Sequence, residues 1–160
     1  MKKVTALSLS STGLDLIKSF EGCKLTAYRD VKGVATIGYG HTFGVKMGMT
    51  ITQAQADEFL KADIKHFEEG VNVLLNELGV QVTQCQFDAL VSLAFNIGLR
   101  ALAKSTLAKY LYTMRQDDQE SIYKVADQFL RWKFSGGKEY PGLLNRRKKE
   151  RLHFLLDAKV

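Results

Sequence analysis

The stretch from Glu21 to His41 reads EGCKLTAYRDVKGVATIGYGH, and its pattern differs from that of the rest of the chain. Two short β-prone segments, Leu25 to Arg29 and Ala35 to Tyr39, are separated by a turn that contains Gly33. Short β-prone runs bounded by glycine-rich turns are typical of antiparallel hairpins. The sequence therefore predicts a small hairpin sheet near the N-terminus.

Helical patterns lie on both sides of this stretch. Before it, residues 11 to 21 carry apolar residues at helical spacing, Ser11 or Thr12 can cap the N-terminus, and Gly22 can end the helix. After it, two capping-box patterns, Thr52 to Gln55 and Thr83 to Gln86, open further helices. The first of these predicts a long helix to about Gly79 and the second a helix buried on most sides, and we expect more helices at about 105–114, 118–132 and 143–157. The predicted fold class is α+β, with a small sheet beside a larger helical part.

Length and composition limit the possible classes. The chain has 160 residues, of which 46% are hydrophobic and 25% charged, as in an average soluble globular domain. With Pro141 as the single proline and no linker-like tract, we expect one domain. No apolar run reaches the roughly 18 residues that a membrane-spanning helix needs, and Val4 to Leu9 is too short for the core of a signal peptide. Cys23 and Cys85 fit no metal motif, so we interpret both as free thiols and expect neither metal nor cofactor.

A net charge of +6 is compatible with nucleic acid, an anionic membrane surface or an anionic wall polymer as partner. The most basic stretch, Arg146 to Arg151, taken alone fits a nucleic-acid patch. Leucines on either side of it, from Leu143 to Leu156, favour instead an amphipathic terminal helix with its leucines buried and its charges solvated.

Glu21 and Asp30 are candidates for the two carboxyl groups that glycoside hydrolysis requires. Glu21 falls at the C-terminal end of a predicted helix beside Phe20, and both features disfavour its anion, as a proton donor needs. Asp30 falls in a polar turn between Arg29 and Lys32, where solvent and cations favour the ionised form. Contrasting environments of this kind suggest an acid and a base, although such carboxylates are common in any domain.

Several motifs together resemble the bacteriophage lysozymes, or endolysins. They are Glu21-Gly22, Ala27 to Asp30, Gly33, Thr36 to His41, Phe95 to Gly98, Ser105 to Leu107, Trp132, Gly136 to Lys138, Gly142-Leu143, Arg146-Arg147 and Glu150. The resemblance covers nearly the whole chain in order. It implies a lysozyme-like fold with a small sheet lobe at about 14–60, a linking helix at about 60–79, a helical lobe at about 80–160 and a cleft between the lobes.

The resemblance also implies roles for single residues. Glu21 would be the general acid, Asp30 would hold or deprotonate the attacking water, and Thr36 would help to position it. Phe95 and Asn96 would contact sugar rings and N-acetyl groups. Arg146 would approach the acid, with Arg147 as the alternative for that position. His41 is interpreted as structural, hydrogen-bonded within the small lobe.

The implied function is a muramidase that cleaves the β-1,4 bond between N-acetylmuramic acid and N-acetylglucosamine, with inversion, and so lyses the host cell. The alternatives are a lytic transglycosylase, a non-catalytic peptidoglycan-binding protein and a basic nucleic-acid-binding domain. We expect a monomer that binds peptidoglycan rather than nucleic acid, does not span the membrane, stays in the host cytoplasm and reaches the wall with the help of a holin.

Overall fold

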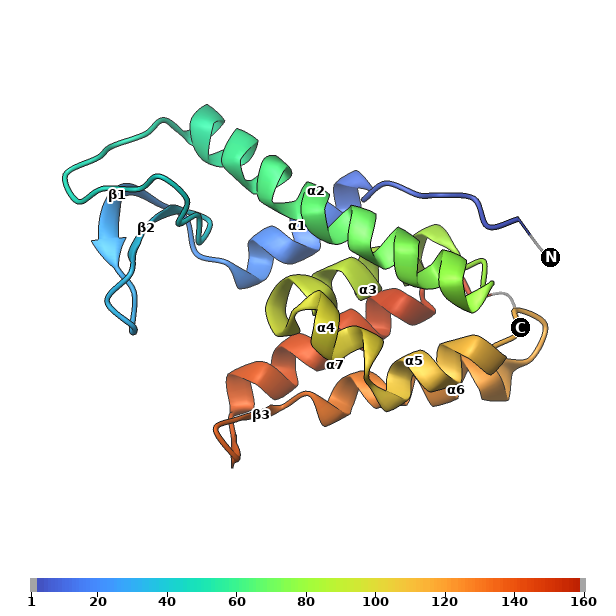
Figure 1. The fold of residues 1–160 in the computed structure, drawn as a ribbon. Helices are drawn as coiled ribbons and strands as arrows, with labels where there is room; N and C mark the ends of the chain where they lie inside the picture. Colours follow the sequence, from blue (N-terminus) through green and yellow to red (C-terminus); the bar gives the residue numbers. More distant parts are fainter. Residues whose placement is uncertain (1–2, 159–160) are drawn as a thin grey trace. The chain divides into compact units, whose positions relative to one another are not determined.

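A computed structural model describes residues 3–158, which divide into two compact units (Figure 1). One unit, Asp15–His66, contains the hairpin and is called the sheet unit here. The other, Met1–Leu14 with Phe67–Val160, is called the helical unit. Two helices contribute residues to both units, α1 (Ser11–Phe20) and α2 (Gln53–Leu78).

The sheet unit is built around an antiparallel pair of strands, β1 (Lys24–Arg29) and β2 (Ala35–Gly38), drawn in light blue in Figure 1. Tyr28 lies opposite Thr36 in this pair. The other edge of β1 is also paired, because the Ala27 N–H donates to the carbonyl of Met49 at 2.9 Å. The predicted hairpin is therefore confirmed, and both edges of its first strand carry backbone hydrogen bonds. The fully buried apolar side chains of this unit are Ile17, Ile37, Ala56, Leu60 and Ile64.

The helical unit is centred on α3 (Gln84–Ile97), which packs against the terminal helix α7 (Pro141–Leu155) (Figure 1). Thr83 caps α3 through the predicted capping box, and residues 86 to 94 are buried without interruption. The prediction of a helix buried on most sides is thus confirmed. Around this pair lie α4 (Leu99–Ala103), α5 (Thr106–Thr113), α6 (Gln119–Gln128), the 3₁₀ helix Phe129–Arg131, and a second hairpin of β3 (Phe134–Ser135) and β4 (Lys138–Glu139).

Side chains of the helical unit hold the extended N-terminal segment by its backbone. Asn72 accepts the Leu7 N–H at 3.0 Å and donates to the Leu7 carbonyl at 2.8 Å. Glu68 accepts the Leu9 N–H at 2.8 Å. Residues 5, 7 and 9 are all bound in this way, so the segment is held at every second residue, as a β-strand would be.

Some predicted boundaries were wrong. The hydroxyl of Ser10 accepts the Gly13 N–H at 3.0 Å and so caps α1 in place of Ser11 or Thr12. The helix predicted to reach Trp132 ends as an α-helix at Gln128 and continues as a 3₁₀ turn. The short helix α4 and the β3–β4 hairpin were not predicted at all. Both are too short to show a periodic apolar pattern.

The predicted leucine stripe of the terminal helix was also wrong. Leu152 and Leu156 are exposed at 63% and 64%. The buried face of α7 consists instead of charged residues, a histidine and one phenylalanine: Arg146, Arg147, Glu150, His153 and Phe154. Paired charges can replace leucines in a protein interior when each finds a partner, and apolar spacing alone gives no sign of this.

Candidate active site

Glu21 directly follows α1, and its backbone N–H still bonds to the Ile17 carbonyl at 3.1 Å, so the helix fixes its position. The residue is half-buried. Its Oε2 lies close to the Gly40 backbone, because a Cβ placed on Gly40 would stand 3.8 Å from it. Gly40 has φ +80°, a conformation that side chains other than glycine rarely adopt. A tight glycine turn therefore passes beside the carboxyl group of Glu21.

Backbone hydrogen bonds close this turn, and side-chain contacts of His41 stabilise it. Ile37 and His41 exchange both backbone hydrogen bonds at 2.9 Å. The His41 ring stacks on Phe59 with centroids 4.3 Å apart, and its Nδ1 lies 2.8 Å from Oδ2 of Asp63. The interpretation of His41 as a structural residue, hydrogen-bonded within the sheet unit, agrees with these contacts.

A second set of contacts fixes the aromatic residue of the turn. The Gln53 amide donates to the Tyr39 hydroxyl at 3.0 Å, and the Lys18 ammonium lies 5.6 Å from the Tyr39 ring centre. Lys18 pairs with Asp57 at 3.2 Å. Their hydrogen bond raises the pKa of Lys18 and lowers the pKa of Asp57. Both side chains therefore remain charged over the physiological pH range.

Asp30 directly follows the first strand and organises the turn after it. Its Oδ1 accepts the backbone N–H groups of Lys32 at 2.8 Å and Val34 at 2.9 Å. Within the described chain, Oδ2 of Asp30 has no hydrogen-bond partner. One oxygen of this carboxylate therefore builds the turn, and the other is available to a ligand.

Thr36 is almost fully buried, and its hydroxyl donates to the carbonyl of Val34 at 2.8 Å. That bond uses the single hydroxyl hydrogen, so Oγ1 can only accept a further bond. Val34 thus links the two predicted residues through its main chain, with its N–H on Asp30 and its carbonyl on Thr36. Sequence reasoning missed Val34 because backbone groups leave no residue-type signal.

The structure places Glu21, Asp30 and Thr36 together in the sheet unit, and it places Phe95, Asn96 and Arg146 in the helical unit. Phe95 is half-buried and meets Phe67 edge-on, with ring centres 5.3 Å apart. Asn96 is exposed and lies at the end of α3. The Arg146 side chain is 9% exposed, and its Nε lies 3.4 Å from Oε2 of Glu150.

Arg147, the alternative to Arg146 in the sequence, is fully buried. Its Nε lies 2.8 Å from Oε1 of Glu150, and its Nη2 donates to Oδ1 of Asn96 at 2.8 Å. Burial lowers the pKa of Arg147 to about 10 and raises the pKa of Glu150. Arg147 therefore contacts one of the predicted substrate-binding residues, a link for which the sequence gave no signal beyond the Arg-Arg pair.

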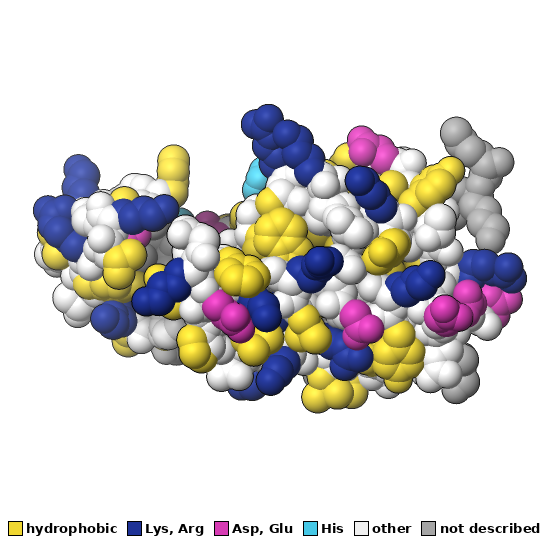
Figure 2. All heavy atoms as spheres, turned by 90° about the horizontal axis from the view of Figure 1, so that it is seen from below, with side chains coloured by type: hydrophobic (Ala, Val, Ile, Leu, Met, Phe, Trp, Pro, Cys, Tyr) yellow, Lys and Arg dark blue, Asp and Glu magenta, His cyan; other side chains and the backbone are white. Residues whose placement is uncertain are grey.

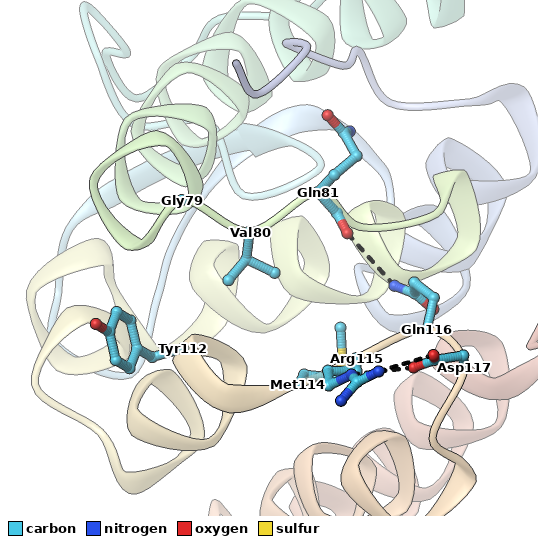
Figure 3. Close-up of a pocket in the computed structure, with 8 residues that line it drawn as sticks. All are labelled: Gly79, Val80, Gln81, Tyr112, Met114, Arg115, Gln116 and Asp117. Atoms are coloured by element: carbon cyan, nitrogen blue, oxygen red, sulfur yellow. Dashed lines mark hydrogen bonds and ion pairs between the residues drawn. The ribbon is translucent and has the colours of Figure 1, made fainter. Parts of the chain in front are cut away.

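A hollow of about 550 Å³ elsewhere in the helical unit is lined by residues 79 to 81, Tyr112 and residues 114 to 117 (Figure 3). Figure 3 shows Arg115 paired with Asp117, and Gln116 donating to the carbonyl of Gln81. None of the predicted site residues lines this hollow. Among residues 3–158 there is also no group of three or more side chains placed to hold a metal ion.

Surface charge was the main support for a nucleic-acid-binding alternative. On the face seen in Figure 2, the Lys and Arg side chains of the helical unit are interspersed with acidic and apolar ones. Several are paired with carboxylates, including Arg115 with Asp117, and Arg151 with Asp127 at 2.9 Å. Over this part of the face the basic side chains form no continuous stripe of the kind that follows a nucleic-acid backbone. No helix in the described part of the chain has the length and apolarity needed to cross a bilayer.

Comparison with known proteins identifies relatives along almost the whole chain. The chain is 45% identical to an endolysin of Bacillus phage B103 over 93% of its own length, but it spans only 54% of that protein. It is 41% identical to the endolysin of Salmonella phage P22, covering 93% of this chain and 99% of the relative. Among solved structures, the muramidase domain of SpmX from Asticaccaulis excentricus is 35% identical with a TM-score of 0.80, covering 92% of this chain and 97% of that domain.

The structural match confirms the predicted α+β, lysozyme-like fold class. The family model for phage lysozyme matches residues 18–150, a range that contains all six predicted site residues. A match of this extent, together with a full-length relative at 41% identity, confirms the resemblance found in the sequence: the chain belongs to the phage lysozyme family.

Proposed function

We propose that this chain is an endolysin of the muramidase type, which hydrolyses the β-1,4 bond between N-acetylmuramic acid and N-acetylglucosamine in peptidoglycan. Family membership supports this substrate class, as do the names of the relatives, endolysins and a muramidase domain. The observation that carries the proposal is the arrangement in the sheet unit, where Val34 links Asp30 to Thr36 and a glycine turn passes beside Glu21.

In the proposed reaction, Glu21 donates a proton to the glycosidic oxygen as its bond to the anomeric carbon breaks. A water attacks that carbon from the opposite side, and Asp30 accepts the proton that the water loses. Oδ2 of Asp30 and Oγ1 of Thr36 both act as acceptors, so each can bind one hydrogen of the water. The water's lone pair would then point away from the protein and toward the sugar.

Inversion at the anomeric carbon is part of this proposal. It requires the carboxyl groups of Glu21 and Asp30 to stand about 6.5–9.5 Å apart, so that a water fits between Asp30 and the sugar. No covalent sugar intermediate would form. We further propose that Phe95, Asn96 and Arg146 belong to the substrate-binding surface, that the two units act as one lysozyme domain, and that a holin gives the chain access to the wall.

Digestion of purified peptidoglycan tests the reaction. Mass spectrometry should find reducing ends that carry one added water, whereas a lytic transglycosylase would leave anhydro ends lighter by one water. Proton NMR of the first-formed reducing end should show the α anomer, the inverted configuration. Glu21→Gln should lower the rate by about a hundred- to ten-thousand-fold, and Glu58→Gln, a change at an exposed carboxylate, should not. Anhydro ends, or full activity of Glu21→Gln, would contradict the mechanism.

A further inference from the structure

The buried pair of Arg147 and Glu150 in α7 is poorly explained by stability alone. Both side chains are fully buried, and their charged atoms lie 2.8 Å apart. Removing two charges from water costs about as much as their attraction returns, so apolar residues of similar size would stabilise the helix at least as well. Within the described chain, Nη1 of Arg147 has no hydrogen-bond partner. Buried donors without a partner are rare in folded proteins, and each one calls for an explanation.

The second contact of Arg147, to Asn96, supplies such an explanation. Its Nη2 donates to Oδ1 of Asn96 at 2.8 Å. A guanidinium group has donors and no acceptor, so the Asn96 amide must turn its oxygen toward Arg147 and its Nδ2 away. Asn96 is exposed, and no described residue binds its Nδ2. A buried charge pair thus fixes the orientation of one surface amide, which offers two N–H donors to a ligand.

We propose that Arg147 is a positioning residue that fixes Asn96 as a hydrogen-bond donor toward the acetamido carbonyl oxygen of a glycan strand. The acetamido carbonyl oxygen is the strongest neutral hydrogen-bond acceptor on an N-acetylated sugar. It carries no hydrogen, so it can only accept a bond. Glu150 holds Arg147 in place, and its carboxylate also pairs with Arg146. This role presupposes the glycan substrate of the proposed function. It adds that, in one hydrogen bond with this substrate, the protein is the donor and the sugar is the acceptor.

The substitution Asn96→Asp tests the NH₂ group of the amide separately from its oxygen. A carboxylate still accepts the bond from Arg147, so the variant should unfold at the same temperature as its parent or higher. It offers no N–H, and it turns an acceptor toward the acceptor of the sugar. Binding of an N-acetylglucosamine tetrasaccharide, measured by calorimetry or NMR titration in a Glu21→Gln background, should weaken about tenfold or more. The matched control Asn76→Asp, at an exposed asparagine of α2, should bind as the parent does.

Retention of the parent's affinity by Asn96→Asp would overturn the proposal. So would equal binding of the tetrasaccharide before and after removal of its N-acetyl groups, because the proposed acceptor is then absent. Binding is measured separately from catalysis. A parent chain that binds the tetrasaccharide through Asn96 but releases no reducing ends from peptidoglycan would refute the proposed hydrolysis and leave this role intact.

A second pair of variants tests Arg147 itself. Arg147→Met alone would leave Glu150 charged in the interior, so it is combined with Glu150→Gln, which keeps an acceptor for Ser92. In this double variant the Asn96 amide is no longer oriented, and the tetrasaccharide should bind several-fold more weakly. Adding Asn96→Ala should then cause little further loss, because both changes remove the same contact. Full additivity of the two effects would show that Arg147 does not act through Asn96.

Discussion

Replacing Asp30 by Asn and by Ala separates its structural contribution from its chemical one. Oδ1 of Asp30 accepts two backbone N–H groups, and Oδ2 has no hydrogen-bond partner within the described residues. An asparagine can place its oxygen at the first position and keep both bonds, while its NH₂ group replaces the oxygen assigned to the water. An alanine loses both.

The expected magnitudes follow from these contacts. Asp30→Ala leaves two turn N–H groups to solvent and should lower the free energy of unfolding by about 1–2 kcal/mol. In a chain of this size that corresponds to a fall in Tm of roughly 2–8 °C. Asp30→Asn should change the free energy of unfolding by no more than about 0.5 kcal/mol. Activity should fall by about a hundred- to ten-thousand-fold in both variants, since neither can accept a proton from water.

Thermal unfolding and the clearing of a peptidoglycan suspension measure the two effects independently. Asp118 provides a matched control, because its Oδ1 accepts the Glu120 N–H at the start of α6 in the same manner, in a part of the chain with no proposed catalytic role. Asp118→Ala should lower stability and leave the rate unchanged. Full activity of Asp30→Asn would refute the reasoning, as would a loss of stability in that variant equal to the loss in Asp30→Ala.

Three further predictions concern the helical unit. Burial raises the pKa of Asp88, but hydrogen bonds from His153 and Ser10 outweigh it and hold the pKa below its ordinary value. Asp88→Ala should therefore cost about 3–5 kcal/mol at pH 7. Denaturant titrations should show this difference shrinking as the pH falls below about 4, where the carboxylate of the unfolded chain becomes protonated first, and it should be lost once the pH passes below the lower pKa of the folded state. A Cβ on Gly70 would lie 2.3 Å from Cδ1 of Leu99, so Gly70→Ala should cost about 1–3 kcal/mol in chemical denaturation despite the better helix propensity of alanine, and Leu99→Ala should relieve that clash. Burial, followed by a hydrogen bond to Asp157, raises the pKa of the Cys85 thiol to about 11, so mass spectrometry should find it barely alkylated at pH 8, and faster alkylation there than of a free thiol would contradict this.

Elements of the fold were predicted correctly from the sequence where a single local pattern pointed to one type of secondary structure. The hairpin between Lys24 and Gly38 was visible from β-prone runs around a glycine turn, and the start of α3 from the capping box at Thr83. Prediction from the sequence failed where a residue type occurs both on the solvated surface and, when paired, in the interior. Arginines near the end of the chain were interpreted as a solvated face, although Arg147 is fully buried against Glu150.

Of the candidate site, sequence reasoning supplied residue types but not the contacts between them. The proximity of Gly40 to Glu21 depends on a turn closed by backbone bonds between Ile37 and His41, which local patterns do not encode. The bond from Arg147 to Asn96 joins residues 51 positions apart and depends on how α3 packs against α7. Tertiary contacts of this kind follow from the assembled core and not from any short segment.

The link through Val34 has a consequence for how this family can vary. Val34 joins Asp30 and Thr36 with its amide and carbonyl, while its own side chain is 44% exposed to solvent. Nineteen of the twenty amino acids carry the same amide and carbonyl, and proline alone lacks the N–H. Substitutions at position 34 other than proline should therefore preserve the link between Asp30 and Thr36, because the link depends on the main chain and not on the identity of the side chain.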